Sequence, residues 1–157
     1  MNELTSAAVL KSFFETAQQG VGQSLEGALR RTGWTEVPPG TRGLGRQWEK
    51  GEVVARQYGG GLNAFVEVTI EIREPDSPDG DEEPYMEDFE ERFNRSLAQA
   101  VSLLGQASFA GEYGDDGFLE DADAVKLAYW SVNDRTAALN FKHEDQGVPF
   151  RITVTLH

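Results

Sequence analysis

The strongest constraint on the fold is a stretch in which apolar and polar side chains alternate. It covers residues 64–73, AFVEVTIEIR. The aliphatic side chains on one side of an extended chain are Val66, Val68, Ile70 and Ile72. The polar side chains on the other side are Glu67, Thr69, Glu71 and Arg73. This period of two is typical of a strand in a sheet that packs one face on a core and leaves the other face polar.

Several further segments have strand character. The first runs from Trp34 to the prolines at 38 and 39, and two short strands form a hairpin around Lys50 and Gly51. The other three segments cover residues 125–132, 136–142 and 149–156. In the last of these, Phe150, Ile152, Val154 and Leu156 alternate inward. Asn133 and Asp134 suit a tight turn between the segments at 125–132 and 136–142.

Helical spacing of apolar residues appears in three places. Residues 6–18 place Val9, Leu10, Phe13, Phe14 and Ala17 at helical spacing, and residues 23–32 do the same with Leu25, Ala28 and Leu29. A long amphipathic helix is predicted over 84–104, with an apolar stripe of Phe89, Phe93, Leu97, Val101 and Leu104. Along the whole chain, the predicted order is two helices, four strands, one long helix and three strands.

This order predicts a single α+β domain over residues 1–157. We expect a mostly antiparallel sheet, with the N-terminal helices and the long helix packed on one face. The sequence shows no internal repeat and no domain linker. It has no low-complexity tract apart from an acidic loop at about 74–84.

The acidity of the chain is concentrated in two blocks. The net charge is −13; residues 74–91 hold ten acids and no base, and residues 112–123 hold six acids and no base. The rest of the chain holds 11 acids against 14 bases. A field of this sign repels nucleic acid and acidic membranes and attracts basic proteins. The alternative for residues 74–83 is a solvated acidic connector.

Self-repulsion among so many acids costs stability, and a basic partner would offset that cost. The helix at 84–104 can present Glu87, Glu90 and Glu91 outward while Phe89 and Phe93 point inward. We therefore expect a partner-binding surface formed by Asp79, Asp81, Glu82, Glu83, Glu87, Asp88, Glu90, Glu91, Asp115, Asp116, Glu120, Asp121 and Asp123.

No motif in the sequence predicts catalysis, a cofactor or a metal site. The chain has no cysteine, and neither register of the first acidic block matches a calcium-binding EF-hand loop. There is no nucleophile elbow and no phosphate-binding glycine loop. His143 is expected in a turn, and Trp34, Trp48 and Trp130 are expected in the core. The basic residues between 30 and 56 have acids among them, so a solvated face is favoured over a nucleic-acid surface.

The N-terminal residues lack the features of a signal peptide, and no stretch approaches the ~18–20 apolar residues of a membrane span. Together with the absence of cysteine, this favours a cytoplasmic protein.

Parts of the chain resemble a known group of proteins. The segments are LEGALRRTGW (25–34), FEERFNRSLAQAVSLLG (89–105) and KLAYWSVNDRTAALNFKHEDQGVPFRITVTL (126–156). They are similar to the small immunity proteins encoded beside polymorphic toxins in actinobacteria, although the acidic insertion at 74–84 departs from that pattern. The resemblance implies a cytoplasmic antitoxin that binds and neutralises a cognate, usually basic, toxin domain. The alternative is an acidic secretion chaperone of the type III class that binds an effector protein.

Overall fold

A computed structural model of the chain describes residues 5–38, 46–59, 61–73, 83–118, 124–143 and 149–157. Within these residues the helices are α1 (Ser6–Gln19), α2 (Leu25–Arg31) and α3 (Glu83–Leu104), with a short 3-10 helix η1 (Gly61–Asn63). The strands are β1 (Thr35–Glu36), β2 (Gln47–Lys50), β3 (Val53–Tyr58), β4 (Phe65–Arg73), β5 (Phe109–Glu112), β6 (Lys126–Val132), β7 (Arg135–Lys142) and β8 (Phe150–Leu156).

The eight strands form one antiparallel sheet in the order β1-β2-β3-β4-β8-β7-β6-β5. This order consists of two four-strand meanders that meet where β4 pairs with β8. Helices α1 and α2 precede the first meander, and α3 precedes the second. The two halves thus repeat one order of elements without a visible repeat in sequence. The prediction of an α+β fold with a mostly antiparallel sheet is confirmed.

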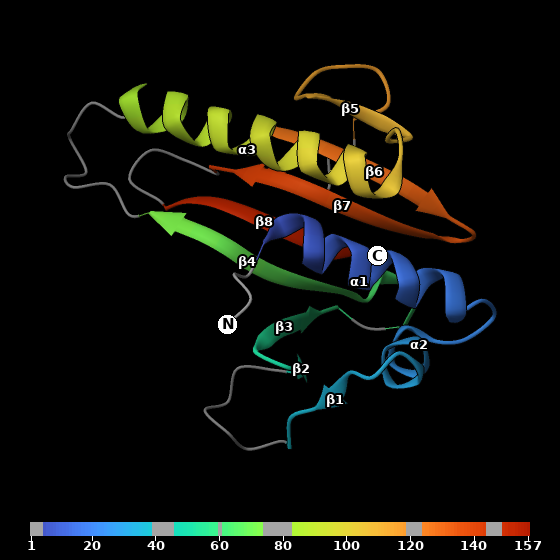
Figure 1. Cartoon of the computed structure of the whole chain (residues 1–157). Helices are drawn as coiled ribbons and strands as arrows, with labels where there is room; N and C mark the ends of the chain where they lie inside the picture. The colour runs from blue at the N-terminus through green and yellow to red at the C-terminus, as the bar shows by residue number, and fades with distance from the viewer. Residues whose placement is uncertain (1–4, 39–45, 60, 74–82, 119–123, 144–148) are drawn as a thin grey trace.

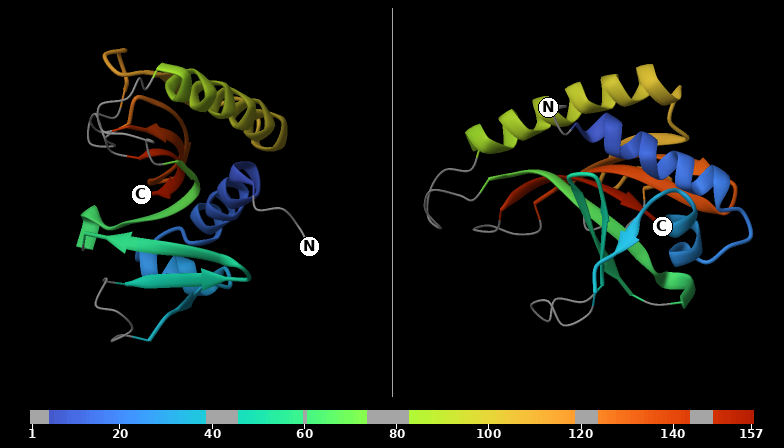
Figure 2. Two further views of the ribbon diagram at one scale, coloured as in Figure 1. Left: turned by 90° about the vertical axis from the view of Figure 1, so that its left-hand side faces the viewer. Right: turned by 60° about the horizontal axis from the view of Figure 1, so that its bottom comes forward.

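Helices α1 and α3 cover the same face of the sheet (Figure 1). The sheet curves so that α1 lies between α3 and the β2–β3 hairpin (Figure 2). The core on this face includes Phe13 of α1 and Phe89 of α3, which are both almost fully buried. The ring centroid of Phe89 lies 5.8 Å from that of Phe150 and 6.2 Å from that of Phe141. The prediction that the helices pack on one face is therefore confirmed.

The buried stripe of α3 differs from the predicted one near its C-terminal end. Phe89, Phe93 and Ala100 are buried, whereas Val101 is 38% exposed. The prediction that Val101 points inward is wrong, because each step of four residues overshoots a full helical turn by about 40°. Three such steps from Phe89 lead off the core face, and a three-residue step from Leu97 to Ala100 restores the contact.

Strand β4 follows the predicted alternation only in its first half. Val66 and Val68 are buried, but the register with β8 shifts between Thr69 and Glu71, as in a β-bulge. A bulge adds one residue to the strand and so reverses which side chains face the core. Beyond it Ile72 is 59% exposed, and the prediction that Ile72 points inward is wrong.

The bulge also turns toward the helices two side chains that were predicted to face outward. Glu71 forms an ion pair with Arg92 of α3, at 2.9 Å. The guanidinium of Arg73 lies 4.4 Å from the centre of the Tyr85 ring, also on α3. The bulge therefore supplies polar contacts that tie α3 to the middle of the sheet.

The sequence predicted no strand between the long helix and residue 125, but the structure forms β5 there. It pairs with β6 at the edge of the sheet, and Phe109 stacks on Tyr129 with ring centroids 5.5 Å apart. Gly111 lets the side chains of Phe109 and Asp115 lie close to the strand, because a Cβ atom there would lie 2.8 Å from the Phe109 ring and 2.6 Å from a carboxylate oxygen of Asp115. Three strands, β5, β6 and β7, therefore precede β8 in the second meander, where the sequence predicted two.

All three tryptophans are buried, as predicted. Trp48 donates from Nε1 to Gln57 Oε1 at 2.8 Å, and Trp130 donates from Nε1 to the carbonyl oxygen of Gly105 at 3.0 Å. Gly105 ends α3, so this second bond fixes the end of the helix against β6.

Candidate functional site

The structure describes seven of the predicted partner-binding acids. Asp79, Asp81, Glu82, Glu120, Asp121 and Asp123 lie outside the described residues. Glu83, Glu87, Asp88, Glu90 and Glu91 share the N-terminal half of α3. Asp115 and Asp116 lie in the turn after β5. The structure thus gathers five of the predicted acids on one helix and places the other two away from them.

Three of the α3 acids have cationic partners within the fold. Asp88 pairs with Arg92 at 3.0 Å, and Glu90 pairs with Lys126 of β6. Glu91 lies 3.6 Å from Arg95 and its side chain is 75% exposed. Glu90 faces outward only in part: its side chain is 43% exposed, because its carboxylate pairs with Lys126.

A line of exposed carboxylates remains on the outer surface of α3. Glu83, Glu87 and Glu91 are all exposed and follow one another at intervals of four residues, so they occupy neighbouring turns of one face. We call these three residues the acidic stripe. Like charges at this spacing repel one another, so the stripe does not stabilise the helix by itself.

The acids of the β5 turn differ in their surroundings. One carboxylate oxygen of Asp115 accepts a hydrogen bond from the backbone N–H of Glu112 at 2.9 Å, so this side chain closes the turn. Asp116 is exposed, and no ion pair to it occurs among the described residues. Asp116 is therefore the better candidate of the two for contact with a partner.

The basic residues near the first meander belong to a local ion-pair network. Arg46 donates from Nε to Glu36 at 2.9 Å and from Nη1 to Glu26 at 3.0 Å. Arg30 donates to Glu36 at 3.0 Å. These pairs agree with the expectation of a solvated face, because the guanidinium groups are already matched by carboxylates.

This network lowers the pKa of two carboxyl groups. The hydrogen bond from Gln57 is the main cause that holds the pKa of Glu26 below its ordinary value of 4.5. The hydrogen bond from Arg46 is the main cause that lowers the pKa of Glu36. Both carboxylates are therefore favoured in their charged form by the native structure.

We expect acid to remove the stability that these two carboxylates contribute. Since their native pKa values are depressed, the contribution is complete above pH 4.5 and is lost as the pH falls through the lowered values. Urea unfolding from neutral pH to below 4.5 should show a shallower acid decline for a Glu26→Gln/Glu36→Gln variant than for the wild type. An identical decline in both proteins would contradict this assignment.

The described residues contain no group of three or more histidine, aspartate or glutamate side chains arranged to hold a metal ion. His143 follows β7, and its ring stacks on Phe150 with centroids 4.0 Å apart. The ring of His143 thus has a packing role beside the core.

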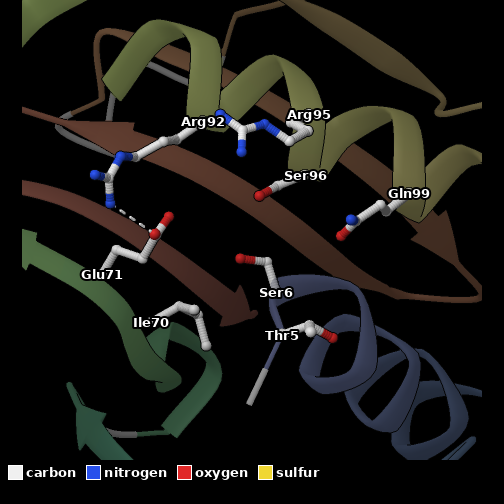
Figure 3. Close-up of a pocket in the computed structure, with 8 residues that line it drawn as sticks. All are labelled: Thr5, Ser6, Ile70, Glu71, Arg92, Arg95, Ser96 and Gln99. Atoms are coloured by element: carbon white, nitrogen blue, oxygen red, sulfur yellow. Dashed lines mark hydrogen bonds and ion pairs between the residues drawn. The ribbon is translucent and has the colours of Figure 1, made fainter. Parts of the chain in front are cut away.

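A polar pocket of about 480 Å³ opens between the start of α1, the bulge of β4 and the middle of α3 (Figure 3). Its lining residues are Thr5, Ser6, Ile70, Glu71, Arg92, Arg95, Ser96 and Gln99. They come from three distant segments of the chain, so no local pattern could have revealed the pocket. Its two arginines and two serine hydroxyls provide several hydrogen-bond donors.

Among the described helices, none is long and apolar enough to cross a membrane. No protein-family model, curated protein or solved structure matches the chain.

Proposed function

We propose that this chain is an immunity protein that binds and neutralises a basic toxin domain through an acidic surface centred on the acidic stripe. The observation that carries the proposal is the exposure of Glu83, Glu87 and Glu91 along one face of a long, firmly packed helix. The carboxylates beside them, Asp88 and Glu90, are already paired within the fold. The stripe is thus the more exposed part of the α3 acids.

The anchoring of α3 supports a binding role. Phe89 and Phe93 bury the inner face of the helix, and the Arg92–Glu71 ion pair joins it to β4. A surface held in place in this way loses little conformational entropy when a partner binds.

The chemistry of the expected partner also fits the stripe. Toxin domains that act on nucleic acids or nucleotides present arginine and lysine side chains to phosphates. Carboxylates accept charge-assisted hydrogen bonds from the same groups, and complementary charge speeds association.

Charge reversal of the stripe tests this proposal. A Glu83→Lys/Glu87→Lys/Glu91→Lys variant should associate with a basic toxin domain that co-purifies with the chain about tenfold more slowly at low salt, or slower still. The dependence of the association rate on salt should flatten, because steering weakens with ionic strength and with lost complementarity. Stopped-flow or surface-based kinetics across a salt series measure both effects.

A matched control reverses three exposed acids outside α3, as Glu49→Lys/Glu52→Lys/Asp134→Lys. This control changes the net charge equally and should retain more of the association rate than the stripe variant. Equal slowing of both variants would assign the effect to net charge. An unchanged rate for the stripe variant, with full protection from toxicity, would remove α3 from the binding surface. A non-toxic effector as the bound partner would favour the chaperone alternative.

A further inference from the structure

The pocket between α1, β4 and α3 lies beneath α3, and none of its lining residues belongs to the acidic stripe. Ser6 enters it from α1, while Arg95, Ser96 and Gln99 enter it from α3 (Figure 3). The lining supplies hydroxyl, amide and guanidinium donors, and the one carboxylate in it, Glu71, is neutralised by Arg92. The contents suited to that space are oxygen atoms that accept hydrogen bonds.

Ser6 is the most informative member of the pocket. It is only 4% exposed, and no hydrogen bond to its hydroxyl group occurs among the described residues. Figure 3 shows this hydroxyl directed into the space between α1 and α3. Because Ser6 lines the pocket, its hydroxyl oxygen is available to a group that occupies the space.

The start of α1 adds a second attraction for negative charge. Ser6 is the first residue of this 14-residue helix, and Thr5 caps it by accepting a hydrogen bond from the N–H of Ala8 at 3.1 Å. The first turn contains no acidic residue. The positive end of the helix dipole is therefore not balanced by a carboxylate of its own first turn, and such an end favours an anion.

The two arginines of the pocket differ in how firmly they are engaged. Arg92 donates to Glu71 at 2.9 Å and to Asp88 at 3.0 Å, so its charge is balanced and its position is fixed. Arg95 lies 3.6 Å from Glu91, beyond a normal hydrogen-bond distance, and its side chain is 64% exposed. Arg95 thus retains hydrogen-bond donors for a ligand.

We infer that this pocket binds a small organic anion and holds its carboxylate or phosphate group between Ser6, the start of α1 and Arg95. Ser96 and Gln99 supply further donors on the α3 side. The volume of about 480 Å³ falls within the usual range for small-molecule sites and exceeds the space that a lone inorganic ion needs. Because the anion would bridge α1 and α3, its binding stabilises the native fold.

Titrations followed by NMR test the inference on the full chain. Inorganic phosphate and succinate are added separately at constant ionic strength, with sodium chloride as the balancing salt. At least one of them should give saturable shifts confined to the amides of residues 5–8, 70–71 and 92–99. Saturation by phosphate alone identifies a phosphate-bearing ligand, saturation by succinate alone identifies a carboxylate-bearing ligand, and saturation by both identifies a site that accepts either group.

Two variants and one control show whether the named groups hold the anion. Arg95→Gln should weaken binding about tenfold or more, because it removes a charge-assisted hydrogen bond. Ser6→Ala should weaken binding by a smaller factor. Arg56→Gln removes the same charge from an exposed site on β3 and should leave the affinity unchanged. Shifts that fail to saturate with both anions, or an affinity that Arg95→Gln and Arg56→Gln lower equally, would overturn the inference.

Discussion

Phe93→Ala should lower the free energy of unfolding by about 3–5 kcal/mol. Phe93 is 3% exposed and belongs to the core that α3 forms with α1 and the sheet. Phe93 lies near the middle of the 22-residue helix α3, so removing its ring leaves a cavity between the helix and the sheet. The neighbouring helix and the sheet limit how far the surrounding side chains can move in to fill that cavity. Urea unfolding at neutral pH measures the loss.

Val101→Ala serves as the control on the same helix. Val101 is 38% exposed, so its truncation should change the free energy of unfolding by no more than about 0.5 kcal/mol. The contrast between the two variants tests which face of α3 is inside. A loss below about 0.5 kcal/mol for Phe93→Ala would show that α3 buries another face.

The elements that the sequence predicted well are those with a sustained period. In α3, Phe89 and Phe93 lie one helical step apart and face the sheet as predicted. In β8, Phe150, Ile152, Val154 and Leu156 alternate inward without interruption and are fully buried. A repeated pattern fixes both the type of element and its buried face, because one slip would expose the whole apolar set.

The elements that the sequence predicted poorly depend on single residues or on distant partners. One inserted residue near Thr69 reverses the second half of β4. Strand β5 has only four residues and depends on its pairing with β6. Neither event leaves a periodic trace, because both are settled by the neighbouring strand.

The candidate site shows the same division between local and distant information. The acidity of α3 is visible in its residues, but the pairing of Glu90 with Lys126 joins positions 36 residues apart. The pocket requires Ser6, Glu71 and Arg95 to meet, and only the packing of α1 against α3 and β4 brings them together. The sequence could therefore predict where acid accumulates, but not which carboxylates stay exposed.

A buried ion pair lies on the face of the sheet opposite α1 and α3. Lys142 Nζ lies 2.7 Å from Glu67 Oε2, and the two side chains are only 10% and 5% exposed. Arg151 approaches the other oxygen of Glu67 at 3.4 Å and is more exposed, at 23%. The alternation in β4 predicted Glu67 on a polar, outward face, so its burial was not foreseen. The pair offsets the cost of removing both charges from water.

Glu67→Leu should therefore cost about 3–5 kcal/mol of stability, because it leaves the buried ammonium group of Lys142 without its carboxylate. Lys142→Met should cost less, since Arg151 remains beside Glu67 and can balance its charge. The double variant Glu67→Leu/Lys142→Met should recover most of the loss, because two apolar side chains replace the pair without leaving a buried charge. Urea unfolding of the four proteins gives the coupling energy through a double-mutant cycle. Additive losses in the double variant would show that the two charges do not depend on each other, and a larger loss for Lys142→Met than for Glu67→Leu would show that Arg151 does not support Glu67.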